Sequence, residues 1–173
     1  MTGKKEDDVN VKNLTISQSK EHGVYGYGMS FHLFNLNIEK SEGNGVAVHS
    51  TKRNTMSNCQ VSHSKQCGVF VVFDGLITMN GSGTSIHNNV TGGSGHCYGL
   101  ETYDDFSSIH LVSPLTKESI SINNGGGGNY GGGGTIAVVD SEGLLDEMPS
   151  TGETKESSST DVSSLFYFFI FSP

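Results

Sequence analysis

The residues best suited to chemistry lie between positions 96 and 105. His96, Glu101, Asp104 and Asp105 bring one imidazole and three carboxyl groups into one short segment. Paired carboxylates act as general acid and base in glycoside hydrolysis when they lie about 5–10 Å apart. Asp and His are also ordinary residents of solvated turns. The sequence leaves open whether the four form a site, and we assign no catalytic, cofactor-binding or metal-binding residue from it.

Other side chains capable of chemistry show no recognisable spacing. The three cysteines lack both the CxxC spacing and the Cys/His spacing of zinc sites: Cys59, Cys67 and Cys97. We therefore expect free thiols and a reducing compartment. Three histidines follow no common position of the repeat described below, which argues against a histidine metal site: His22, His63 and His87.

Two further segments allow more than one interpretation. Four aromatic residues could form a platform for stacking a sugar, or pack inward and cap the fold: Tyr25, Tyr27, Phe31 and Phe34. The segment GGGGNYGGGG at 125–134 lacks the GK[ST] ending of a phosphate-binding loop. We interpret it as a flexible spacer within an expanded turn.

The element that must position these residues is a repeat. The stretches NLTISQSKEHGV (13–24), NLNIEKSEGNGV (35–46) and NCQVSHSKQCGV (58–69) recur with a period of 22 to 23 residues. Apolar residues alternate with the period of two that is typical of strands, and Gly, Ser and Asn separate the strands. Such a unit predicts one coil of a parallel β-helix, with equivalent residues stacked at about 4.8 Å.

The alignment predicts four columns along the stack. Two of them are inward apolar columns: Leu14, Leu36 and Cys59, and Ile16, Ile38 and Val61. The third is a corner column whose hydroxyls are expected to form a hydrogen-bond ladder: Ser19, Ser41 and Ser64. The fourth lies at a turn where we expect positive φ: Gly23, Gly45 and Gly68.

The pattern continues with interruptions. A fourth coil keeps Ile86 and Asn89, but six extra residues around 90–95 precede Gly99-Leu100. A fifth, degenerate coil restarts at Ile120 and resumes at 135–138 after the glycine segment. Weaker third strands are expected at Met56, 77–79 and 109–111. Insertions of this kind are tolerated because each coil needs to match only its neighbours.

The chain divides into four segments. A polar lead-in at 1–9 precedes an all-β parallel β-helix of about five coils of 22–25 residues at 10–140. An acidic, Ser/Thr-rich segment at 141–164 is expected to be a disordered linker. A hydrophobic tail follows at 165–173, and we leave open whether its LFYFFIF stretch (165–171) caps the last coil. A globular β-sandwich is the alternative fold, since short strands at this spacing suit it too.

The repeated unit xLxIxxSxxxGVxV, at 14–24, 36–48 and 59–71, resembles the right-handed parallel β-helix repeat of pectate-lyase-like proteins and of carbohydrate-binding and sugar-hydrolase β-helix domains. Right-handedness follows from this resemblance and from the general crossover preference. The resemblance is specific for fold and weak for function, because the superfamily includes lyases, hydrolases, adhesins and interaction domains.

The family's catalytic patterns are not matched. The resemblance to galacturonan hydrolases implies an NTD-like triplet, paired Asp, then GHG-like and RIK-like triplets. Here Gly95-His96-Cys97 precedes Asp104-Asp105, and no RIK-like triplet follows. A calcium-dependent lyase needs several carboxylates and a basic residue, and Arg53 is the only arginine.

We therefore predict a non-catalytic binding or interaction module, a fragment of a larger β-helix protein, with no cofactor. Its partner would be a protein or a glycan that meets a strand face and the turn insertions at 90–95 and 125–134. Uncapped coils could also associate end to end. The alternative is a carbohydrate-active enzyme, or a remnant of one, using the region of His96, Asp104 and Asp105.

Composition limits the partner and the compartment. The net charge of −8 argues against nucleic acid, whose binding depends on basic side chains. The opening MTGKKEDDVN contains no apolar segment of a signal peptide, so a complete chain would be cytoplasmic. The tail at 165–171 is too short to span a bilayer, which takes about 20 apolar residues.

Overall fold

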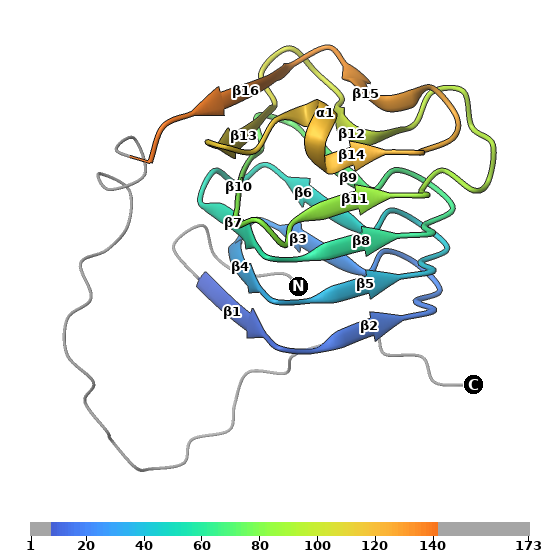
Figure 1. The fold of residues 1–173 in the computed structure, drawn as a ribbon, viewed down its shortest axis with the longest axis horizontal. Coiled ribbons are helices and arrows are strands. Elements are labelled where there is room, and N and C mark those ends of the chain that lie inside the picture. The colour runs from blue at the N-terminus through green and yellow to red at the C-terminus, as the bar shows by residue number, and fades with distance from the viewer. Residues whose placement is uncertain (1–7, 142–173) are drawn as a thin grey trace.

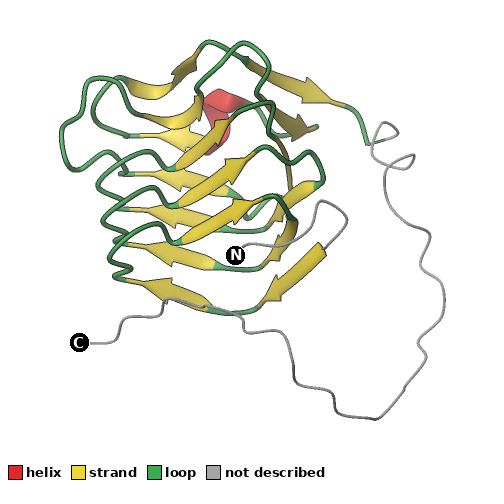
Figure 2. Cartoon of the chain, turned by 180° about the vertical axis from the view of Figure 1, so that it is seen from behind, coloured by secondary structure: helices red, strands yellow, loops and turns green. Residues whose placement is uncertain are grey.

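The computed structural model describes residues 8–141, which form a parallel β-solenoid of about six turns (Figure 1). Three parallel sheets run along the solenoid axis, and Figure 2 shows their stacked strands from behind. The expected fold class is confirmed. The turn count is about six instead of five because one strand precedes the first repeat and another follows the last.

The first sheet contains β1 (Asp8–Lys12), β4 (Ser30–Phe34), β7 (Asn54–Ser57), β10 (Leu76–Asn80), β13 (Ser108–Val112) and β16 (Thr135–Val139). The second contains β2 (Thr15–Ser17), β5 (Asn37–Glu39), β8 (Gln60–Ser62), β11 (Ser85–His87) and β14 (Ser121–Ile122). The third contains β3 (Val24–Tyr27), β6 (Val46–His49), β9 (Val69–Val72), β12 (Tyr98–Thr102) and β15 (Gly128–Gly132). A single helical turn, α1 (Lys117–Ile120), precedes β14. The weaker strands expected at 56, 77–79 and 109–111 are confirmed as β7, β10 and β13.

The strand register places equivalent residues of successive coils above one another, as the repeat alignment predicts. Ile38 pairs with Ile16 below it and with Val61 above it. Leu36 and Cys59 are buried, whereas Leu14 is 39% exposed. Leu14 belongs to the inward column but lies in the first described coil, so no coil of residues 8–141 covers it from below.

The glycine column is explained by crowding, and the expectation of positive φ is wrong. Gly23, Gly45 and Gly68 do not have positive φ. A Cβ at Gly23 would lie 2.5 Å from Ile38 Cγ2 and 2.6 Å from the Gly45 carbonyl oxygen. Each glycine therefore lets the next coil approach its backbone, which a side chain would prevent.

Positive φ occurs instead at bends that the sequence fills with other residues, and two of these bends recur through several coils. The first bend follows β1, β4 and β7 and holds Asn13, Asn35 and Asn58, at φ of 51° to 55°. The second follows the strands of the second sheet, at φ of 55° to 58°: Gln18, Lys40, His63, Asn88 and Asn123. Asparagine suits such bends because its short polar side chain tolerates the left-handed region.

The serine corner is buried but forms no ladder. Ser41 and Ser64 are at most 1% exposed, and neither hydroxyl oxygen has a hydrogen-bond partner. Ser19 Oγ donates instead to the His22 carbonyl in its own turn. The hydroxyls of neighbouring coils therefore do not bond to one another, and the expected serine ladder is wrong. Serine fits this corner because its side chain is small.

The middle of the glycine segment is a strand. Residues 128–132 form β15, which pairs in parallel with β12, so the expectation of a flexible spacer is wrong. The ring of Tyr98 explains the composition, since a Cβ at Gly131 would lie 2.5 Å from its Cε1 and Cζ atoms. Gly131 thus makes room for an aromatic side chain of the coil below.

No helix within residues 8–141 is long and apolar enough to cross a membrane. The expected linker at 141–164 and the tail at 165–173 lie outside the described residues, apart from Ser141, and so does nearly all of the lead-in at 1–9.

Candidate functional site

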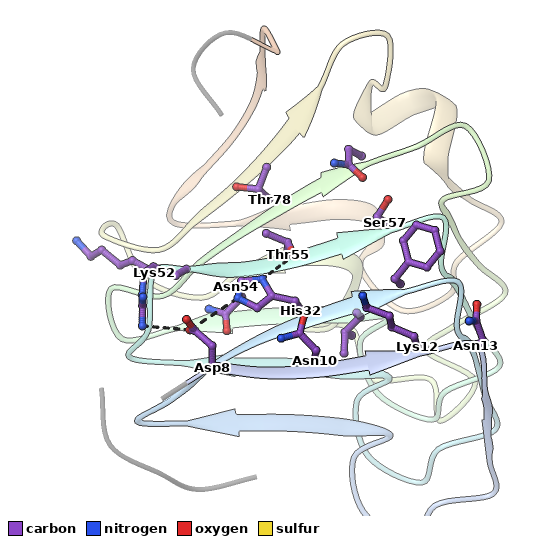
Figure 3. Close-up of a pocket in the computed structure, with 14 residues that line it drawn as sticks. Asp8, Asn10, Lys12, Asn13, His32, Lys52, Asn54, Thr55, Ser57 and Thr78 are labelled. Carbon is purple, nitrogen blue, oxygen red and sulfur yellow. Dashed lines mark hydrogen bonds and ion pairs between the residues drawn. The ribbon is translucent and has the colours of Figure 1, made fainter. Parts of the chain in front are cut away.

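The main concave site lies on the outer face of the first sheet, over β1, β4, β7 and β10 (Figure 3). It has a volume of about 550 Å³, and we call it the basic groove. Its cationic and amide or hydroxyl groups include Lys12, Lys52, Arg53, Asn10, Thr55 and Thr78. The aromatic ring of Phe34 also lines it.

Strand register builds the groove from two outward columns. His32 pairs with Asn10 on one side and Thr55 on the other, and Thr78 continues this column. A second column contains Lys12, Phe34, Ser57 and Asn80. Alternate residues of a strand share one face. The inward neighbours therefore anchor the strands in the core while these side chains line the groove.

A chain of polar contacts orders one end of the groove. Asp8 Oδ1 lies 3.1 Å from Arg53 Nη2 and 3.7 Å from His32 Nε2. The other ring nitrogen of His32, Nδ1, lies 2.9 Å from Thr55 Oγ1. The contacts hold the imidazole between a carboxylate and a hydroxyl, as Figure 3 shows.

The groove concentrates positive charge in an acidic chain. Three of the seven lysine and arginine residues in 8–141 line it: Lys12, Lys52 and Arg53. Asp8 is the single carboxylate among its described lining residues. Lys52 pairs at 2.8 Å with Asp74, which is not one of those residues. The lining thus holds more cations than carboxylates, with Arg53 paired to Asp8 and Lys52 paired to Asp74.

The structure gives the three carboxyl groups between 96 and 105 separate environments, although His96 lies near enough to Glu101 to act against the rise that burial causes in its pKa. His96 and Asp105 are exposed, whereas Glu101 on β12 is only 5% exposed. Asp104 lies in the turn after β12, where its carboxylate accepts hydrogen bonds from the Phe73 backbone, at 2.6 Å, and from Ser107 Oγ, at 2.9 Å. The carboxyl groups have different environments and do not converge on a common groove.

Asp104 has a structural role in its turn. Partial burial acts to raise the pKa of its carboxyl group, but hydrogen bonds from the Phe73 backbone and the Ser107 hydroxyl lower that pKa below its usual value. A carboxylate that accepts several hydrogen bonds stays ionised. Asp104 therefore joins the turn after β12 to the turn after β9.

The four aromatic residues divide among three locations. Phe31 is fully buried in the core, and Phe34 lines the basic groove. Tyr25 and Tyr27 lie on β3 and begin an aromatic row with His49 and Phe73, in which successive ring centroids are 4.5 to 6.4 Å apart. A single platform made of all four does not exist.

The sequence analysis missed the basic groove because it relied on the second and third strands of each coil, whose spacing repeats more regularly along the chain. The groove belongs to the first sheet, whose strands gave the weakest repeat signal. Aligning the outward positions of 10, 32, 55 and 78 would have revealed a polar column.

A comparison with protein families agrees with the architecture. The family described as "Right handed beta helix region" matches residues 1–143. The chain therefore belongs to the right-handed β-helix family, and the expected resemblance is confirmed. No curated protein and no solved structure matches the chain.

Proposed function

We propose that this chain is a non-catalytic binding module whose basic groove binds an acidic oligosaccharide. The observation that carries the proposal is the concentration of Lys12, Lys52 and Arg53 beside amide and hydroxyl groups in one hollow of an otherwise acidic chain. Charge-assisted hydrogen bonds from these cations suit the carboxylate or sulfate groups of such a glycan.

The other lining groups favour a sugar over a small inorganic anion. Asn10, Thr55, Thr78 and Asn80 offer donors and acceptors spaced along four coils, which matches a chain of hydroxyl-bearing rings. Phe34 is 44% exposed and presents an apolar ring on which a sugar can stack. An extended ligand could cross successive strands along the solenoid axis.

Binding is favoured over hydrolysis by the carboxylate count. Hydrolysis of a glycosidic bond uses a pair of carboxyl groups, one on each side of the bond. Asp8 is the only carboxylate among the groove's described lining residues. A carbohydrate-active enzyme is the second candidate, supported by His32, whose ring lies between Asp8 and Thr55. A base oriented by a carboxylate is an arrangement that catalysis uses.

The test is calorimetric titration of the full chain with acidic and neutral oligosaccharides of equal length. We expect binding of the acidic series alone, and Lys12→Gln should weaken it about 3–10-fold, since a charge-assisted contact is lost. Lys20→Gln is the matched control, because Lys20 is exposed and pairs with Glu42, outside the groove.

Failure of the wild-type chain to bind any acidic oligosaccharide would refute the proposal. Product release should be measured in the same samples. Turnover that is lost in His32→Gln and kept in His63→Gln would establish the enzyme instead.

We also propose that a second copy of the chain can associate end to end. Leu14 lies at one end of the described solenoid, and Ile122 and Val138 lie near the other, each at least 39% exposed. Unpaired strand edges favour such pairing. Light scattering across a concentration series should show dimers that Leu14→Lys weakens, and a strictly monomeric wild-type chain would contradict the idea.

A further inference from the structure

Cys67 meets Glu101, which lies 34 residues further along the chain, and Cys97 beside the third sheet. The Sγ atoms of Cys67 and Cys97 and a carboxylate oxygen of Glu101 all lie within 4.8 Å of one another. The thiol of Cys67 donates a hydrogen bond to Glu101 Oε2 at 2.8 Å. Cys67 and Glu101 are at most 5% exposed, and Cys97 is half-buried. We call this group the thiol pocket.

The repeat explains the place of Cys67. Its equivalents one and two coils below are Asn44 and His22, and each of these accepts the backbone N–H of the next coil. His22 Nδ1 accepts from Asn44, and Asn44 Oδ1 accepts from Cys67, at 3.1 and 3.0 Å. Cys67 therefore stands at a position that presents an acceptor atom to the coil above.

The insertion before β12 supplies the second thiol. Cys97 ends this insertion, and its backbone is held by two hydrogen bonds: its N–H donates to the Ser94 carbonyl, and its carbonyl accepts from Gly127. Glu101 lies on β12 opposite Phe70 of β9, on the face turned away from the core residue Leu100. Cys67 thus comes from the coil below, whereas Cys97 and Glu101 come from one segment just before and within β12.

Among the described residues, the thiol pocket contains no lysine or arginine partner, and His96 is the basic residue whose charge acts on Glu101. No ion pair joins Glu101 to a lysine or arginine in the part of the chain that the structure describes. Burial raises the pKa of the Glu101 carboxyl group. Burial also raises the pKa of the Cys67 thiol, with the nearby Glu101 adding to the effect, while a hydrogen bond from the Tyr98 backbone opposes it.

We propose that Cys67, Cys97 and Glu101 form a binding site for a thiophilic divalent cation of the zinc class. Thiolates select zinc over calcium or magnesium. Zinc binds cysteine sulfur at about 2.3 Å in a tetrahedral arrangement, which places two sulfur ligands about 3.8 Å apart. The observed separations, all below 4.8 Å, allow this geometry with small side-chain rotations. Water would be the fourth ligand.

Metal binding releases protons from the two thiols. Each thiol loses its proton to solvent when its sulfur becomes a ligand, so that the bound cation faces two thiolates and one carboxylate. No oxidant or reductant is involved. Uptake should therefore acidify a weakly buffered solution in proportion to the metal bound.

The test uses the full chain, reduced by a phosphine and freed of metal. Titration with Zn²⁺ against a competing chelator should show one ion per chain, and Co²⁺ should produce the near-ultraviolet absorption of thiolate-to-cobalt charge transfer. Cys97→Ser should weaken binding at least 10-fold and reduce that absorption, because a ligand is lost. Glu101→Gln should weaken binding but keep the absorption.

Controls separate a metal site from a folding defect. Cys59→Ala removes the third thiol, which is buried in the core away from the pocket, and should keep full metal affinity. Cys97→Ser is preferred to Cys67→Ser because Cys97 is only half-buried. The proposal is overturned if the reduced wild-type chain takes up no Zn²⁺, or if folded Cys97→Ser binds as tightly as wild type.

Discussion

The corner of the solenoid is built differently in its regular coils and in the coils that carry insertions. In the regular coils the corner holds Ser41 and Ser64, whose hydroxyls have no hydrogen-bond partner. In the next two coils the same column holds Asn89 and Asn124. Asn89 Oδ1 accepts from the Ser64 backbone N–H, and its Nδ2 donates to the Val61 carbonyl, both at 3.0 Å.

The difference shows that an insertion removes backbone hydrogen bonds between coils and that a side chain replaces them. Where coils repeat without interruption, backbone groups pair from coil to coil and the corner needs only a small side chain. Where residues 90–97 leave the regular path, an asparagine side chain binds backbone groups of the coil below. Buried backbone groups must be paired, so the residue type at the corner follows the local path of the chain.

The largest expected effect concerns the close stacking of the regular coils. In Gly45→Ala the new Cβ would overlap Val61 Cγ1 and lie 2.7 Å from the Gly68 carbonyl oxygen. Backbone cannot move aside as a side chain can, so we expect a loss of about 3 kcal/mol or more in the free energy of unfolding. Urea denaturation measures it.

Gly95→Ala is the matched control in the insertion. Nothing lies within 4 Å of a Cβ at Gly95, and its φ is not positive. We expect a change within about 0.5 kcal/mol. Equal effects of the two substitutions would show that coil stacking does not set the glycine positions.

A smaller effect separates the two kinds of corner. Asn89→Ala leaves the buried Ser64 N–H and Val61 carbonyl without the partner they have now, and should cost about 2 kcal/mol. Ser64→Ala removes a hydroxyl that has no partner and should be neutral or slightly stabilising. Thermal unfolding of both variants decides the matter, and a Ser64→Ala cost equal to that of Asn89→Ala would contradict the comparison.

The smallest effect is a pH dependence in the first regular coil. Burial lowers the pKa of His22 below 6.5, although Glu21 acts to raise it. The unfolded chain then binds the proton more readily than the folded one. The contribution of His22 to stability is therefore complete above pH 6.5 and is lost as the pH falls through the folded pKa.

His22→Asn should reduce this loss, because asparagine offers a similar acceptor and already occupies the equivalent position 44. Urea midpoints between pH 8 and pH 5 measure the slope. Gln18→Asn is the control, because position 18 lies in the same coil and carries no titratable group. It should keep the wild-type slope. An unchanged slope in His22→Asn would show that His22 does not titrate as proposed.

Most of the coil architecture could be predicted because it depends on local periodicity. The spacing of Leu36 and Ile38 and its recurrence one coil later predicted inward columns that the structure confirms. The glycine column was correctly located but given the wrong cause, since close approach between coils is invisible in one coil's sequence. The same is true of β15, in which Gly131 lies against the ring of Tyr98.

The candidate site was harder to predict. His96, Glu101, Asp104 and Asp105 are close in sequence, but a turn and strand alternation give the three carboxyl groups separate environments. The basic groove joins Asp8, His32 and Thr55, which are more than 20 residues apart from one coil to the next. Proximity across coils depends on register, which the weak repeat signal of the first sheet did not reveal.

By itself the sequence determined the repeat. Its period, the alternation of apolar and polar residues and the small residues at bends are local properties that recur from coil to coil. Only the tertiary structure decided which outward side chains share a groove, and that Cys67 meets Cys97 across an insertion. The physical reason is that stacking at a fixed strand spacing brings residues together by their position in the coil. Distance along the chain then says little about distance in space.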